Sequence, residues 1–149
     1  MKIQVDNDKI IIYLYNYFFK NYEKKYLIDD IKKIFLRLIQ YYHIEINGGY
    51  DVIVYQNTKY GTILEIIKQD ELLFPNDFID IKVKFYKNTN FYLRAKDYYI
   101  FKDYYNVKYY NGYYYINIDD VDNILKVLEF TEILYKEKDN YLDKMKLIK

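Results

Sequence analysis

An Asn-Gly dipeptide between two tyrosine-rich runs constrains the fold of this chain more than any other feature. The segment from position 104 to 120 reads YYNVKYYNGYYYINIDD, with Asn111-Gly112 at its centre. Asn and Gly both tolerate the positive φ values of a type I′ turn, so the dipeptide predicts a β-hairpin. Pairing outward from the turn sets the register: Tyr110 opposite Tyr113, Tyr109 opposite Tyr114, Lys108 opposite Tyr115 and Val107 opposite Ile116.

The two faces of this hairpin differ in character because side chains alternate along a strand. Two interpretations of its more polar face stay open. Tyrosine is common in strands, so the rings can be ordinary sheet construction, with cover from another segment. Alternatively, they form an amphipathic surface that binds a protein or stacks unpaired bases. The expected core face holds Val107, Tyr109, Tyr114, Ile116 and Ile118, and the tyrosine face holds Lys108, Tyr110, Tyr113, Tyr115 and Asn117.

Two aspartate pairs, Asp29-Asp30 and Asp119-Asp120, each precede a run with apolar residues at three- and four-residue steps. Carboxylates in such positions accept the free N–H groups of a helix start, so the pattern predicts helices over 31–42 and 121–135. Phe130 and Ile133 fall on the charged side of the second helix, where they would form an exposed apolar edge for docking or dimerisation. The alternative is that this helix bends near Thr131 or that the tail covers the edge.

Runs rich in β-branched and aromatic residues predict strands around these helices. Two of them, 80–86 and 91–94, are expected to pair as a hairpin around 87–90. The whole order predicts an α+β fold, with a mostly antiparallel sheet of roughly six to eight strands and two helices packed on one face. The remaining expected strands are 2–5, 9–15, 43–47, 50–56 and 60–68.

The chain length of 149 residues suits one compact domain, 1–149, ending in a charged tail over 137–149 that is free to be mobile. Basic side chains number 23 and acidic ones 22, so no overall field attracts nucleic acid or anionic lipid. The chain has no cysteine and no uncharged run long enough to span a bilayer, and we therefore expect a cytoplasmic protein. The tyrosine count follows in part from AT-rich codons and alone indicates no function.

The residues that most enzymes need are scarce. The chain has no Ser and no Cys, and His43 is its one histidine, so the common nucleophiles and zinc sites are lacking. We therefore predict no enzymatic activity, no cofactor and no metal. One alternative is a metal-dependent nuclease, for which Asp80-Ile81-Lys82 would supply a D-x-K motif with Asp51 or Asp77. An alternating charged strand also produces this motif by chance.

A series of short motifs spans most of the chain. Its first part holds Met1-Lys2-Ile3, Asp8-x-Ile10, a helix, 49–54 and Gly61 leading to 64–67, and its second part holds 109–115 and a helix with Leu128-Glu129-Phe130. In this order the motifs resemble the two halves of MecA-type competence adaptors. The resemblance implies a non-catalytic adaptor, in which one domain captures a client protein and the other docks it on a Clp-type unfoldase. This chain is shorter and lacks the acidic linker of that family. No client- or ATPase-contacting residue maps onto it, so no site is carried over.

These observations together predict a non-enzymatic protein-binding module, either an adaptor or a small inhibitor. Its partner is expected to be a protein of unknown identity, with homodimerisation possible and no membrane contact. The alternative function is binding of single-stranded nucleic acid by stacking on aromatic rings. The residues expected to contact the partner are Lys108, Tyr110, Tyr113 and Tyr115 of the hairpin, together with Phe130 and Ile133.

Overall fold

The computed structural model describes residues 1–46, 48–69, 79–136 and 146–147. They divide into two compact units, each built around a five-stranded sheet. Unit 1 comprises 1–56 and 61–87, and unit 2 comprises 57–60 and 88–149. The fold is therefore α+β, as expected, but it has two sheets where we expected one, and the sheet of unit 1 contains a parallel pair of strands.

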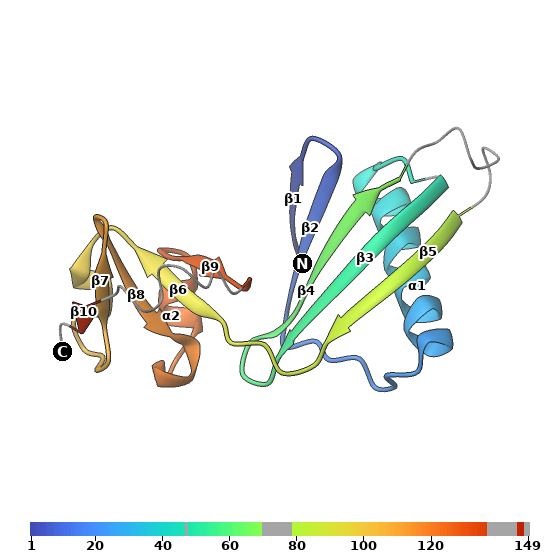
Figure 1. Ribbon diagram of the computed structural model, residues 1–149. Helices are drawn as coiled ribbons and strands as arrows, with labels where there is room; N and C mark the ends of the chain where they lie inside the picture. The colour runs from blue at the N-terminus through green and yellow to red at the C-terminus, as the bar shows by residue number, and fades with distance from the viewer. Residues whose placement is uncertain (47, 70–78, 137–145, 148–149) are drawn as a thin grey trace. The chain divides into compact units, whose positions relative to one another are not determined.

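The sheet of unit 1 runs in the order β1-β2-β4-β3-β5, with a helix, α1, along one face (Figure 1). β1 pairs antiparallel with β2, and β2 pairs antiparallel with β4. β5 pairs in parallel with β3, from Gly48 opposite Ile79 to Tyr55 opposite Tyr86. The expected hairpin of 80–86 with 91–94 is therefore wrong, because the two strands lie in different sheets. The bounds are β1 Lys2–Asp6, β2 Lys9–Tyr15, α1 Lys24–Tyr42, β3 Gly48–Asn57, β4 Gly61–Lys68 and β5 Ile79–Tyr86.

Helix α1 begins seven residues before the predicted start, so Asp29 and Asp30 lie inside it and do not cap it. The N-cap residue is Glu23. The apolar stripe extends back to Leu27, which is 1% exposed and lies one helical turn before Ile31. The stripe packs on the sheet face that carries Ile12, Val52, Val54, Leu64 and Ile66.

The carboxyl end of α1 is closed by His43, whose φ is 53° and whose backbone N–H donates to the carbonyl of Leu38. A left-handed residue at this position satisfies a carbonyl of the last turn. Residues 43–46 form no strand, so the expected strand over 43–47 is wrong for the described part of that segment. His43 has a structural role here.

The sheet of unit 2 runs in the order β10-β7-β8-β6-β9. Its central hairpin confirms the predicted register, since Tyr110 pairs with Tyr113 and Lys108 pairs with Tyr115. The turn residues Asn111 and Gly112 have φ values of 49° and 85°, as a type I′ turn requires. The bounds are β6 Tyr92–Ala95, β7 Lys108–Tyr110, β8 Tyr113–Asn117, β9 Glu132–Leu134 and β10 Lys146–Leu147.

The predicted helix over 121–135 is wrong. Its segment contains a short helix, α2, at Leu125–Leu128, and then turns into β9. Strand β9 pairs with β6, and this pairing places Ile133 opposite Leu93. Asp119 and Asp120 lie in a short 3₁₀ helix, Ile118–Asp120, whose cap is the side chain of Asn117, which accepts from the Asp119 N–H at 2.9 Å. The expected aspartate cap is wrong here too.

The two units are interleaved along the chain. The turn over 57–60 lies between β3 and β4 of unit 1 but belongs to unit 2. Asn57 Nδ2 donates to the carbonyl of Thr89 at 2.8 Å, and the rings of Tyr60 and Phe91 lie 5.7 Å apart. The turn is therefore held by the segment that follows β5.

Further expectations concerned the carboxyl-terminal tail, Asp77 and a membrane-spanning segment. Most of the expected tail, 137–145 and 148–149, lies outside the described residues, as does Asp77. Within the tail, Lys146 and Leu147 pair with Tyr109 and Lys108 of β7. Among the described residues, no helix has the length and apolar character that crossing a membrane requires.

Candidate functional site: an aromatic groove in unit 2

The tyrosine face of the hairpin extends across the whole sheet of unit 2. Directly paired residues share a face, so Lys108, Tyr115, Arg94 and Glu132 form one row across four strands. Tyr113 lies on the same face, two residues before Tyr115. The opposite face carries Leu93, Ile116 and Ala95, which are all buried.

Burial corrects two details of the expected faces. Tyr115 is 4% exposed and cannot contact a partner. It occupies the central strand, with Lys108 paired on one side and Arg94 on the other, so its neighbours cover it. Tyr109, expected in the core, is 38% exposed; it lies in β7, whose outer neighbour among the described residues is the two-residue strand β10. Lys108, Tyr110 and Tyr113 are half-buried.

Two of the expected partner-binding residues, Tyr113 and Phe130, line the same groove. The groove encloses about 380 Å³. Phe130 follows α2 in a turn, where its N–H donates to the carbonyl of Val127 at 3.1 Å, and its side chain is 62% exposed. The full lining is Arg94, Ala95, Lys96, Asp97, Ile100, Tyr113, Glu129, Phe130, Thr131 and Glu132. We call this site the Tyr113–Phe130 groove.

Basic side chains fix the Tyr113 ring. The guanidinium of Arg94 lies 4.4 Å from the ring centroid, and Lys96 Nζ lies 5.6 Å from it. Cations at such distances are attracted by the ring quadrupole. These contacts restrict the Tyr113 ring and lower the conformational entropy that ordering it would cost.

Arg94 is itself held by Glu132 across the β6–β9 pair, through a hydrogen-bonded ion pair between Nη2 and Oε2. Partial burial acts to lower the pKa of Arg94, but hydrogen bonds to Glu132 and Tyr115, together with their charges, outweigh it and raise the pKa above its ordinary value. The guanidinium is permanently charged. The groove thus has a rigid, charged wall beside exposed aromatic surface.

The expected pairing of Phe130 with Ile133 is wrong. Ile133 lies in β9, opposite Leu93 on the inner face, whereas Glu132 faces the groove beside Arg94. Lys108 lines a different hollow on the tyrosine face, of about 310 Å³, with Tyr92, Asn117 and Leu147. No local signal indicated Arg94 or Glu132, because their roles depend on the long-range pairing of β6 with β9.

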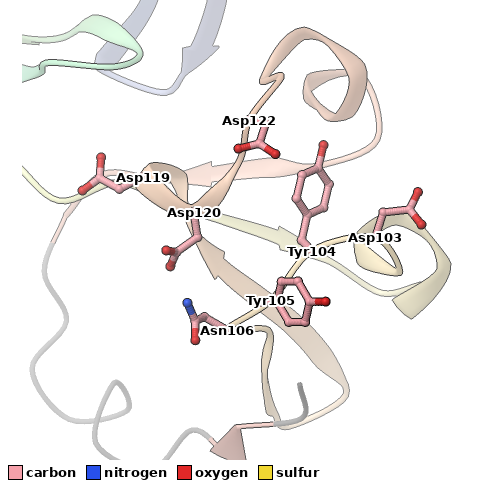
Figure 2. A pocket seen from close by; sticks show the side chains of 7 residues that line it. All are labelled: Asp103, Tyr104, Tyr105, Asn106, Asp119, Asp120 and Asp122. Atoms are coloured by element: carbon pink, nitrogen blue, oxygen red, sulfur yellow. The ribbon is translucent and has the colours of Figure 1, made fainter.

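A third hollow in unit 2 is acidic. Figure 2 shows its seven lining side chains, with the carboxylates of Asp103 and Asp119 on opposite sides. Burial raises the pKa of the Tyr104 hydroxyl, and the nearby charges of Asp122 and Asp103 add to this. In the ranges that the structure describes, no three His, Cys, Asp or Glu side chains gather closely enough to hold a metal ion.

The D-x-K motif of the nuclease alternative lies in unit 1. Asp80 and Lys82 are in β5, and Lys82 is directly opposite Asp51 of β3. The Asp51 carboxylate already accepts a hydrogen bond from Gln69 Nε2 at 2.7 Å.

Comparisons with protein-family models, curated proteins and solved structures found no significant match for this chain.

Proposed function

We propose that this chain is a non-catalytic protein-binding module, an adaptor or a small inhibitor, and that it binds its partner at the Tyr113–Phe130 groove. The observation that supports this most is the placement of two large aromatic side chains, one 62% exposed, along one groove with a fixed charged wall. Exposed aromatic residues beside arginine are typical of the residues that contribute most binding energy in protein interfaces.

The charge of the groove favours a protein over nucleic acid. Its basic residues are Arg94 and Lys96, and its acidic residues are Asp97, Glu129 and Glu132. Phosphate backbones bind surfaces with a clear excess of positive charge, which this lining does not offer. A peptide segment with one apolar side chain for the Phe130 surface and charges of both signs beside it would fit better.

The resemblance of the sequence motifs to MecA-type adaptors suggests a more specific form of this proposal, in which the partner is a client protein or an unfoldase. A purified MecA-type client or Clp-type unfoldase is therefore a sensible first candidate for binding assays. The general proposal does not depend on this resemblance, since it rests on the groove alone.

The test compares Phe130→Ala with a matched control. Leu125 in α2 is 61% exposed and does not line the groove, so Leu125→Ala removes a similar exposed apolar surface elsewhere in unit 2. Each purified variant is used to capture proteins from an extract of the source cells, and captured proteins are then purified and titrated by calorimetry. We expect Phe130→Ala to weaken binding by tenfold or more, about the effect of removing an interface hot spot, and Leu125→Ala to leave it unchanged.

A partner that binds Phe130→Ala and Tyr113→Ala as tightly as the unaltered protein, with both variants folded, would refute the groove. The nucleic-acid alternative is tested with a labelled single-stranded oligonucleotide at several salt concentrations. Affinity that falls steeply with salt would support that alternative, because phosphate contacts release counterions. We expect no such binding.

A further inference from the structure

The outer edge of β1 carries a self-complementary pattern that points to a second copy of this chain. In the part of the chain that the structure describes, β1 ends the sheet of unit 1 and has β2 as its one neighbour. An edge strand presents unpaired backbone N–H and C=O groups and is a template for another strand. Val5 in this strand is 63% exposed.

The turn fixes which backbone groups of β1 point outward. β1 and β2 are joined by the two residues Asn7 and Asp8, and Asp6 pairs with Lys9. The pair that closes a two-residue turn exchanges both hydrogen bonds, and such pairs alternate with non-bonded pairs along an antiparallel ladder. The backbone groups of Lys2, Gln4 and Asp6 are therefore directed to β2, and those of Ile3 and Val5 are directed outward.

When β1 strands of two copies pair antiparallel, with Gln4 opposite Gln4, the outward N–H and C=O groups of Ile3 and Val5 form hydrogen bonds. In this register Ile3 of one copy exchanges hydrogen bonds with Val5 of the other, and Lys2 lies opposite Asp6. Opposite charges and apolar pairs directly across two strands are stabilising. Ile3 packs against the core under α1, so Val5 of the second copy extends that apolar surface.

The other edges lack this pattern. β5, the opposite edge of the same sheet, carries the exposed residues Lys82 and Lys84. Lysines on an edge strand oppose pairing with another chain. The edge strands of unit 2, β9 and β10, have only three and two residues. β1 is therefore the edge best suited to pair with a second copy.

We propose that this chain forms a twofold dimer by antiparallel pairing of β1 with β1, joining two unit 1 sheets into one continuous sheet. The partner is a second copy because the sequence Lys2-Ile3-Gln4-Val5-Asp6 complements itself when reversed. The contact is small, so we expect a weak dimer, with a dissociation constant on the order of 10–100 µM.

A single introduced cysteine tests the register directly, because the chain has none of its own. In the proposed dimer, position 4 faces position 4 of the other copy in a non-hydrogen-bonded pair, with Cα atoms about 4.5 Å apart. That distance lies within the range of disulfides. We expect Gln4→Cys to form a covalent dimer under mild oxidation at concentrations near the dissociation constant.

The matched control is Lys2→Cys, whose two thiols would be about 13 Å apart along the strands. Lys2→Cys alone should form no covalent dimer, but it should cross-link when mixed with Asp6→Cys. Absence of the Gln4→Cys dimer, or equal cross-linking of Lys2→Cys alone, would overturn the proposal.

Charge reversal gives a second, non-covalent test by sedimentation velocity. Lys2→Glu or Asp6→Lys alone should weaken dimerisation about tenfold, and the double variant should restore it, because the pairs are then reversed but complementary. A wild-type protein that stays monomeric at high concentration would overturn the proposal, as would single reversals without effect. Phe130→Ala should leave the dimer unchanged, which separates this test from that of the groove.

Discussion

Replacing Gly61 by alanine should destabilise unit 1 far more than replacing any other glycine with a positive φ. Gly61 begins β4 with a φ of +126°. A Cβ there would lie 2.5 Å from the Leu14 carbonyl oxygen and 2.7 Å from the backbone nitrogen of Asn16. These are backbone atoms, so rotating a side chain cannot relieve the contact.

The magnitude combines two costs. A non-glycine residue in this backbone region costs about 1–3 kcal/mol, and forcing atoms into a filled space costs a further 1–3 kcal/mol, approximately. We therefore expect Gly61→Ala to lower the free energy of unfolding by about 4 kcal/mol. Gly48, in the same sheet, has a φ of +86°, and a Cβ added to it would meet no atom of the residues that the structure describes within 4 Å. Gly48→Ala should therefore cost only about 1–2 kcal/mol.

The assay is urea unfolding followed by far-ultraviolet circular dichroism, which reports mainly on α1. The difference between the two variants isolates the steric contact, because both glycines have positive φ. Equal losses of stability for Gly61→Ala and Gly48→Ala would show that backbone strain alone matters and that the close approach of 14–17 to β4 is wrong.

Two further predictions concern the face of the unit 1 sheet opposite α1. Lys9 Nζ lies 3.0 Å from the carboxylate of Glu65, whose side chain is fully buried. Lys9→Met should therefore lower the free energy of unfolding by about 2–3 kcal/mol. In the same urea assay, adding Glu65→Gln should recover part of this loss. A Lys9→Met variant as stable as the parent would contradict a stabilising Lys9–Glu65 ion pair. Burial first, then the charge of Glu65 and the Tyr86 hydroxyl, raise the pKa of Tyr55 from 10.0 to about 12. The unfolded chain then loses this proton at lower pH than the folded one, so the stabilisation is complete below pH 10 and is lost as the pH rises towards 12. Tyr55→Phe should lose less stability over that interval, and parallel curves for the two proteins would refute the shifted pKa.

Features set by neighbouring residues could be predicted from the sequence. The hairpin register from Lys108 to Tyr115 follows from the backbone angles that Asn111-Gly112 prefers, and these do not depend on the rest of the fold. The strands 2–5 and 9–15 were predicted closely for a similar reason, since a short turn joins them. The residues of the tyrosine face of unit 2 were assigned correctly, but Tyr115 on that face is buried and Tyr109 on the opposite face is exposed.

Features that depend on the pairing of strands distant in the chain could not be predicted from the sequence. Residues 121–135 have a helical apolar pattern, yet backbone pairing of β9 with β6 determines the conformation of their last part. The parallel pair of β3 and β5 joins segments separated by β4, and adjacent strands give no sign of it. Arg94 joins the groove through the pairing of β6 with both β8 and β9, so the sequence predicted the aromatic rings of the groove but not the charged residues beside them.

The turn over 57–60 has a consequence for dissecting the molecule. The backbone passes between the units at three junctions, after Gln56, after Tyr60 and after Lys87. A fragment that ends at Lys87 would keep all of unit 1. In that fragment Asn57 would lose its hydrogen bond to Thr89, and Tyr60 would lose its ring contact with Phe91. A fragment starting at Asn88 would lack the buried Tyr60 ring that contacts Phe91. Cutting the chain at a single position therefore cannot separate the two units with all of their residues.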